Sequence, residues 1–429
     1  MTGRSHTGDR PTACIFSLTP VTDEPRVLRQ SQALHRRGWN VVVVGYTGRQ
    51  RPPGYWRFIE VAHISRARTQ LERLVSRLEL TLSRFSPRLA EEHYWQCAGY
   101  DGIREQVSYL EGVRCDLAIA HDYFTAPLAA FLADLNRCPF VVDIHEYSRG
   151  QYMHDARWRR VTRPWVHAIQ KRLLPQAAIV TTVCDGIADL LHREYRLKTR
   201  PIVVRSTPFY EDLPFRKTNP ARVVVLYHGI LAQMRGLEEA IASVPLWRPE
   251  FSLVIRGPGP EDYVAALQEL IHKHGVSERV VLDPPVAAGE MVREANKADI
   301  GFFIQPDISP QKRFTLPNKF FEYIMARTAL CVADLPEMAR IVRQFDLGHL
   351  VSGMAPENIA SCINSFTAES IDNFKRQSMK AACTLCWERE AEHMLAAYET
   401  VTTDPRSDRR ADQESDVTVH DAAIGGMES

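Results

Sequence analysis

A short segment around residue 318 combines the residue types that bind a phosphate and a sugar diol. Pro317 and Asn318 are typical of a helix start, where unpaired backbone amides attract phosphate. Lys319 adds a positive charge, and Glu322 lies one turn further on the same face, where its carboxylate can accept hydrogen bonds from a diol. The spacing fits a nucleoside diphosphate. The alternative is an ordinary amphipathic helix with an exposed Lys and Glu.

A second segment, residues 227–237, could approach the same ligand. Gly229 would let the backbone come close to a bound group. Arg235, followed by Gly236, would place a guanidinium at the start of a helix, where a diphosphate needs a counter-charge. By itself this signal is weak, and its value depends on the fold that surrounds it.

The elements that must position these segments follow from the hydrophobic pattern. Short apolar, β-branched runs alternate with segments of helical period, which indicates parallel sheets covered by helices on both sides. The expected strands are 13–16, 41–44, 117–120, 140–142, 179–183 and 202–204, then 223–227, 253–255, 280–282, 300–304 and 330–333.

The order of these runs predicts an α/β chain with two doubly wound, Rossmann-like domains that face a central cleft. Ligands of such sheets bind at the carboxyl ends of the strands, so both segments should meet there. The expected parts are a flexible N-terminus 1–11, a first domain 12–207, a proline-rich linker 208–220, a second domain 221–385, a C-terminal helix 386–401 that packs back on the first domain, and a disordered tail 402–429.

The net charge of +1 over 429 residues hides an asymmetry. Residues 1–205 contain 30 Lys+Arg and 20 Asp+Glu (+10), which leaves 23 and 32 (−9) for residues 206–429. Arginines alternate with leucines in residues 66–88 and stand near Trp158 and Trp165 in residues 157–172, a composition that suits an anionic membrane. The alternative is a solvated basic face. No motif for binding nucleic acid accompanies the charge, so none is expected as a partner.

Location and cofactor use follow from other features of the sequence. No run approaches the ~18 apolar residues of a membrane span, the N-terminus is polar, and the nine cysteines are scattered. We therefore expect a cytoplasmic protein, in peripheral contact with the inner face of the plasma membrane if the basic segments bind it. No Asp-x-Asp triplet occurs, so no metal is expected.

Taken together, these segments and their order resemble the retaining, metal-independent glycosyltransferases of family 4, which have the GT-B fold. The resemblance covers about residues 12–400. Its motifs are DEPRVLR at 23–29, HD at 121–122, DIHE at 143–146, VCDGI at 183–187, RG at 235–236 and PNKFFEY at 317–323.

The resemblance implies roles for individual residues. Glu322 would bind the donor ribose, Arg235 and Lys319 the diphosphate, and the backbone at Asn318 the phosphates or the sugar, beside Gly229. His145 would lie next to the transferred sugar. The implied sets are catalytic His145, Arg235 and Lys319, donor-binding Gly229, Arg235, Asn318, Lys319 and Glu322, and acceptor-side Asp23, Arg26, His121 and Glu146.

Three of these residues have plain structural alternatives, and the chain departs from the family at four positions. His145 could be a structural histidine, Asp23 a helix N-cap and Arg26 a solvated arginine. The departures are Phe314 at the earlier of two glutamates, Ile230 at a basic position, Cys184 at a serine and Ser206 at an asparagine.

The expected activity is transfer of a sugar from a UDP- or GDP-sugar to a glycan or lipid-linked acceptor, in surface polysaccharide biosynthesis. Two alternatives stay open. One is a GT-B protein that binds a nucleotide sugar without turnover, and the other is a nucleotide-sugar epimerase.

Overall fold

A computed structural model describes residues 10–61, 69–83, 85–96, 112 and 114–402. Most of the expected flexible N-terminus and all but the first residue of the expected tail lie outside the described residues, as do residues 66–68 and Arg84 of the first basic segment. No helix of the described part is both long enough and apolar enough to cross a bilayer.

The first domain is built on a seven-stranded sheet in the order β3-β2-β1-β4-β5-β6-β7, in which every paired strand is parallel. Its strands are β1 (Thr12–Pro20), β2 (Asn40–Tyr46), β3 (Trp56–Glu60), β4 (Leu117–His121), β5 (Phe140–Ile144), β6 (Ile179–Thr182) and β7 (Ile202–Val203). The central strands form because their apolar runs are buried on both faces, as in the four consecutive buried valines of β2.

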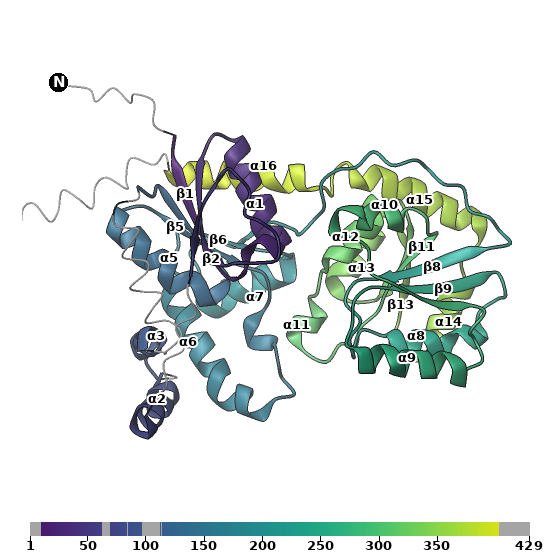
Figure 1. Ribbon diagram of the computed structural model, residues 1–429, viewed down its shortest axis with the longest axis horizontal. Coiled ribbons are helices and arrows are strands. Elements are labelled where there is room, and N and C mark those ends of the chain that lie inside the picture. Colours follow the sequence, from purple (N-terminus) through teal and green to yellow (C-terminus); the bar gives the residue numbers. More distant parts are fainter. Residues whose placement is uncertain (1–9, 62–68, 84, 97–111, 113, 403–429) are drawn as a thin grey trace, which may run out of the picture.

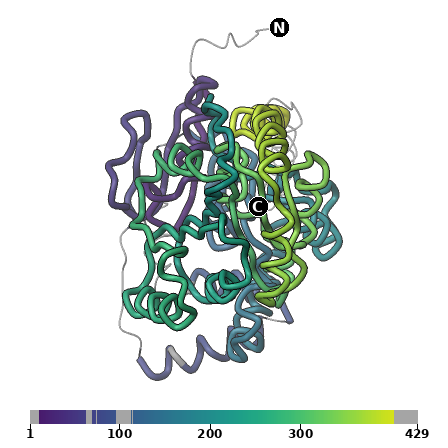
Figure 2. The backbone as a smooth tube through the Cα atoms, turned by 90° about the vertical axis from the view of Figure 1, so that its right-hand side faces the viewer, coloured from purple at the N-terminus to yellow at the C-terminus, as the bar shows by residue number. Residues whose placement is uncertain are grey.

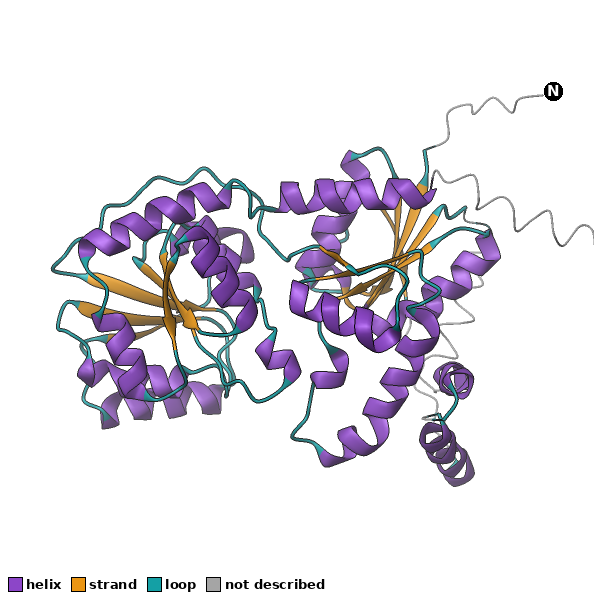
Figure 3. Cartoon of the chain, turned by 180° about the vertical axis from the view of Figure 1, so that it is seen from behind, coloured by secondary structure: helices purple, strands orange, loops and turns teal. Residues whose placement is uncertain are grey.

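The second domain repeats this plan with six parallel strands in the order β10-β9-β8-β11-β12-β13. They are β8 (Val223–His228), β9 (Phe251–Arg256), β10 (Val280–Asp283), β11 (Ile300–Phe303), β12 (Ala329–Ala333) and β13 (Gly348–Val351). Figure 3 shows helices on both faces of each sheet. The prediction of two doubly wound α/β domains is confirmed.

The helices of the first domain are α1 (Pro25–Arg36), α2 (Gln70–Leu82), α3 (Pro87–Gln96), α5 (Asp122–Asn136), α6 (Arg163–Leu173) and α7 (Asp185–Tyr195), with short turns η1 (Val21–Asp23), η2 (Ser148–Gly150) and the π-helical η3 (Trp158–Thr162). Those that follow are α8 (Leu237–Ser243), η4 (Val244–Leu246), α9 (Glu261–Lys273), η5 (Ala288–Glu290), α10 (Met291–Ala295), α11 (Pro310–Arg313), α12 (Asn318–Met325), α13 (Pro336–Phe345), α14 (Pro356–Asn364), α15 (Ala368–Ala382) and α16 (Trp387–Thr402).

Two connections join the domains, which lie side by side in Figure 1. One is the extended segment between β7 and β8, and the other is α16, which runs from the second domain onto the first and packs on α1. Trp387, Met394 and Tyr398 are buried in the first domain's core. In Figure 2, turned by 90°, α16 is the yellow helix near the top. The first domain is thus completed by residues from the far end of the sequence.

Candidate functional site

A cavity of about 790 Å³ lies between the domains, at the carboxyl ends of the strands. His145 and Glu146 line it from the first domain, just after β5. Arg235 and Asn318 line it from the second domain, at the N-terminal ends of α8 and α12. The structure therefore brings residues from both expected halves of the site to one space.

Lys319 is the most unusual cation near this cavity. Lys319 follows Asn318 in the first turn of α12 and is 7% exposed. Its Nζ has no hydrogen-bond partner among the described residues. The Nζ atom lies 3.7 Å from the ring centroid of Tyr227 and 5.0 Å from that of Phe303. Burial, and then the charge of Arg235, hold the pKa of Lys319 well below its usual value.

Gly229 makes room for this lysine. Its φ of +115° belongs to the region that favours glycine, and a Cβ at this position would lie 3.0 Å from Lys319 Nζ. A side chain at residue 229 would therefore both strain the turn after β8 and crowd the ammonium group.

Two further cations face the cavity close to Lys319. Arg235 lines it from the turn before α8, and Lys312 lines it from α11. Burial, and next the charge of Arg235, lower the pKa of Lys312. Among the described residues, none of these three cations forms an ion pair within 4.0 Å. The second-domain side of the cavity thus carries a group of cations without close carboxylate partners among the described residues.

Glu322 lies one helical turn after Asn318 and does not line the cavity itself. Its carboxylate oxygen Oε2 lies 3.0 Å from Nε2 of His228, at the end of β8, and its side chain is 19% exposed. The ring of His228 stacks on Tyr323 at 4.6 Å between centroids. These contacts hold the Glu322 carboxylate at the edge of the cation group.

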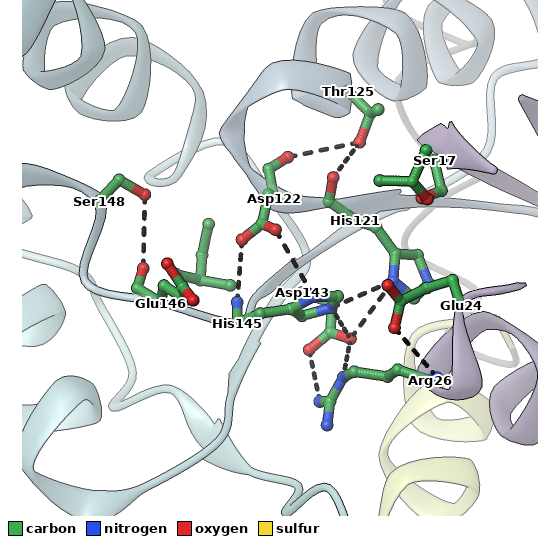
Figure 4. A network of polar contacts seen from close by, with 12 residues as sticks. Ser17, Glu24, Arg26, His121, Asp122, Thr125, Asp143, His145, Glu146 and Ser148 are labelled. Carbon is green, nitrogen blue, oxygen red and sulfur yellow. Dashed lines mark hydrogen bonds and ion pairs between the residues drawn. The ribbon is translucent and has the colours of Figure 1, made fainter. Parts of the chain in front are cut away.

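On the opposite side of the cavity, Asp143 is the centre of a fully paired network, shown in Figure 4. Its carboxylate is buried and accepts hydrogen bonds from Arg26 Nε at 2.6 Å, Arg26 Nη2 at 2.7 Å and Thr181 Oγ1 at 2.6 Å. Arg26 also donates to the carbonyl of Val204. Burial opposes ionisation of Asp143, but the charges and hydrogen bonds of Arg26 and His145 together outweigh burial and hold the pKa of Asp143 well below its usual value.

His145 is held by this network with a defined proton position. His121 Nε2 lies 2.8 Å from Gln30 Oε1, which accepts, so His121 Nδ1 is left to accept. His145 Nε2 lies 3.1 Å from both His121 Nδ1 and the Asp143 carboxylate, and it must therefore carry the proton. Burial lowers the pKa of His121 to about 3. For His145 burial acts downward too, but Asp122 and Asp143 raise its pKa.

The other residues that were expected on the acceptor side do not all line the cavity. Glu146 lines the cavity and pairs with Gln151, and burial together with Asp122 raises its pKa. Asp23 instead accepts hydrogen bonds from Arg49, and Glu24 is the N-cap of α1. The alternatives that made Asp23 the N-cap and Arg26 a solvated arginine are therefore wrong, because Arg26 is 3% exposed.

Several residues that line or support the cavity were not predicted from the sequence. The backbone amide of His145 donates to Asp122 Oδ1 at 2.9 Å, and Asp122 has a φ of +62°. Gln311 accepts from the amide of Tyr147 at 2.5 Å across the domain junction. Glu24 and Lys312 line the cavity. Lys312 stands only seven residues before Lys319, which was the one signal available.

Phe314 closes the junction between the domains. Its carbonyl accepts from Cys184 Sγ at 3.3 Å, and a Cβ at Gly186 would lie 2.2 Å from its ring. Close by, the amide of Gly186 donates to Glu337. At the position where the family often has a glutamate, this chain therefore uses an aromatic ring to pack one domain on the other.

His121, Asp143 and His145 also lie close enough together to hold a metal ion. However, the Asp143 carboxylate accepts hydrogen bonds from Nε and Nη2 of Arg26, and His121 Nε2 is hydrogen-bonded to Gln30 Oε1. A cation here would meet Arg26 at once, so the donor set fits a positioning network better than a metal centre.

Residues 24–207 match the family described as Glycosyl transferase 4-like domain. The match covers most of the first domain. No curated protein matches the chain.

Solved structures share the fold at low sequence identity. Sucrose-phosphate synthase from Thermosynechococcus elongatus has a TM-score of 0.66 at 14% identity, over 91% of this chain and 99% of that one. HepE from Anabaena, in complex with UDP and glucose, has 0.64 at 12%, over 91% and 100%. WaaG, a glycosyltransferase involved in lipopolysaccharide biosynthesis, has 0.61 at 12%, over 92% and 100%. The expected GT-B fold is confirmed.

Proposed function

We propose that this chain transfers a sugar, with retention of configuration and without a metal, from a nucleoside-diphosphate sugar to an acceptor hydroxyl. The observation that carries the proposal is the set of unpaired cations Arg235, Lys312 and Lys319 beside a helix N-terminus. A diphosphate supplies the negative charge that this set lacks, and in a cavity poor in water each contact is stronger than in solution.

The donor is placed by the same elements. Arg235 and Lys319 bind the diphosphate, the amides at Asn318 contact the phosphates or the sugar, and Glu322 accepts hydrogen bonds from the ribose hydroxyls. HepE, which shares the fold, binds UDP and glucose, and this supports a nucleotide-sugar donor for the present chain as well. In this proposal the donor is a hexose linked to UDP or GDP.

In the reaction itself, the bond between the anomeric carbon and the diphosphate oxygen breaks while the acceptor oxygen bonds to the same face of that carbon. The departing phosphate takes the acceptor proton, so no protein nucleophile is required. Arg235 and Lys319 stabilise the charge on the departing diphosphate. His145, which carries its proton on Nε2, orients the transferred sugar from the first domain.

The acceptor is a glycan or a lipid-linked glycan, and the pathway is surface polysaccharide biosynthesis in the cytoplasm. Support comes from the apolar side chains Met153, Met234 and Ile308, which line the cavity beside its polar groups. They suit an acceptor that is only partly polar. WaaG, another protein with this fold, is involved in lipopolysaccharide biosynthesis.

The test is a panel of nucleotide sugars, first by thermal midpoint and then by turnover. A cognate donor raises the midpoint through mass action, and with a glycolipid acceptor it gives a product whose new bond keeps the donor's anomeric configuration. His145→Ala should reduce turnover and leave the affinity for the nucleoside diphosphate unchanged. Donor binding without any transfer would favour the non-catalytic alternative, and conversion of the donor without an acceptor would favour the epimerase.

A further inference from the structure

Helix α2 presents its apolar side chains away from the protein. Leu80 packs on the first domain's core and Ser83, just after the helix, is buried, so this side of α2 faces inward. The opposite side forms a stripe within about 100° of arc. We call it the α2 stripe, and its residues, with their exposed fractions, are Leu71 (69%), Leu74 (64%), Val75 (43%), Leu78 (59%) and Leu82 (41%).

The surroundings of the α2 stripe are positively charged. Arg77 is exposed on the same helix, and η3, which contacts α2, carries exposed Arg159 and Arg160. The nearby acidic groups are engaged locally, since Glu72 closes the capping box of α2 and Glu79 lies 3.5 Å from His93. An apolar stripe beside arginines complements a surface of anionic headgroups over acyl chains.

This surface continues to the acceptor side of the cavity. Residues 151–154, which lead into η3, line the cavity next to His145 and Glu146. Among them Tyr152 is 57% exposed, and its ring centroid lies 5.9 Å from that of Trp158 in η3. In Figures 1 and 3, α2 and α3 lie at the periphery of the first domain, on the side away from the second domain.

We propose that the α2 stripe docks this chain on an anionic membrane, with the leucines at the level of the headgroups and the η3 arginines on the lipid phosphates. Docked in this way, the acceptor side of the cavity opens beside the lipid surface, and this part of the inference rests on the proposed function. A second copy of the chain is a poorer occupant, because a symmetric dimer through this face would set the arginines of both copies against each other.

The test uses the full chain and sedimentation with vesicles of phosphatidylcholine alone or mixed with phosphatidylglycerol. Wild type should bind the mixed vesicles at low salt. The double variant Leu74→Glu/Leu78→Glu should bind them at least about tenfold more weakly. The matched control is Leu135→Glu/Leu246→Glu, which changes two leucines of similar exposure (46% and 51%) on other faces and should bind as wild type does.

Charge is tested separately by Arg159→Gln/Arg160→Gln, which should weaken binding to the mixed vesicles and reduce its dependence on salt. Nucleoside-diphosphate affinity should be the same in all variants, so a failure of docking is distinguishable from a failure of the donor site. The proposal is overturned if wild type ignores anionic vesicles at low salt, or if Leu74→Glu/Leu78→Glu binds them unchanged. It is also overturned if the stripe instead makes wild type dimerise without vesicle binding.

Discussion

The two walls of the cavity, one from each domain, differ in whether their buried charged side chains have partners in the protein. On the first-domain wall, Asp143 has Arg26, Thr181 and His145 as partners, and each is within hydrogen-bond distance. On the second-domain wall, Lys319 is almost as deeply buried, and its Nζ lies near the rings of Tyr227 and Phe303. The carboxylate of Asp143 is paired within the protein, whereas Lys319 Nζ has no hydrogen-bond or ion-pair partner among the described residues.

This difference distinguishes charged side chains that stabilise the fold from charged side chains that are available to bind a ligand. A buried charge is costly unless it is paired, so a network such as that of Asp143 fixes the positions of its members. A buried cation without a partner lowers stability in the free protein and gains a counter-charge on binding. In the proposed function, the first wall orients His145 and the second wall binds the diphosphate.

The largest expected effect is the loss of a paired charge. Asp143→Ala should reduce the free energy of unfolding by about 3–5 kcal/mol, because Arg26 is left buried without a counter-ion. Chemical denaturation followed by circular dichroism measures this. The double variant Arg26→Met/Asp143→Leu should recover most of the loss, and an equal loss in the double variant would contradict the pairing argument.

A smaller effect is expected from Glu322, which accepts the ribose hydroxyls in this account. Glu322→Ala should weaken nucleoside-diphosphate binding by about 1–3 kcal/mol. Calorimetry with a diphosphate whose ribose lacks both hydroxyls provides the control, because wild type should lose affinity for this analogue and the variant should not. If the variant still discriminates between the two ligands, Glu322 does not contact the ribose.

The sign of the next effect distinguishes the two walls. Lys319→Met should leave the free energy of unfolding unchanged or raise it by up to about 1 kcal/mol, since the substitution removes a buried cation with no partner. The same denaturation experiment that detects the loss in Asp143→Ala measures it. A loss of about 3 kcal/mol or more would mean that Lys319 has a structural partner.

The smallest effect is a dependence on pH. Burial, and then Arg235, lower the pKa of Lys319 in the free protein, and a bound diphosphate should raise it. Binding should then take up protons, so affinity should fall as the pH rises above the lowered pKa of Lys319 in the free protein. Calorimetry in buffers of different ionisation enthalpy measures the uptake. Lys319→Arg, which stays charged, should lose this dependence, and a retained slope would assign it to another group.

Much of the fold could be predicted because buried parallel strands are continuous β-branched runs. Two strands were not predicted. Trp56–Glu60 and Gly348–Val351 lie at sheet edges, and their partly exposed residues weaken the hydrophobic signal. Residues 158–173 form two elements, η3 and α6, and the change of hydrogen-bond register between them does not show in the hydrophobic periodicity.

The two walls also differed in how far their residues could be predicted. Lys319 and Glu322 stand close together in sequence, so one helix brings them together. The pair of Arg26 and Asp143 spans 117 residues, and only the sheet order places the start of α1 beside the end of β5. Burial of Arg26 depends on that contact, and this is why the sequence left a solvated arginine open.

Titration calorimetry of UDP and GDP into wild type and Lys319→Met measures whether the unpaired cations of the second wall bind a nucleoside diphosphate. Wild type should bind at least one of the two, and Lys319→Met should bind it at least about tenfold more weakly, although the variant is at least as stable as wild type. Equal affinity in the two proteins, or no binding of either nucleotide to wild type, would contradict the proposal.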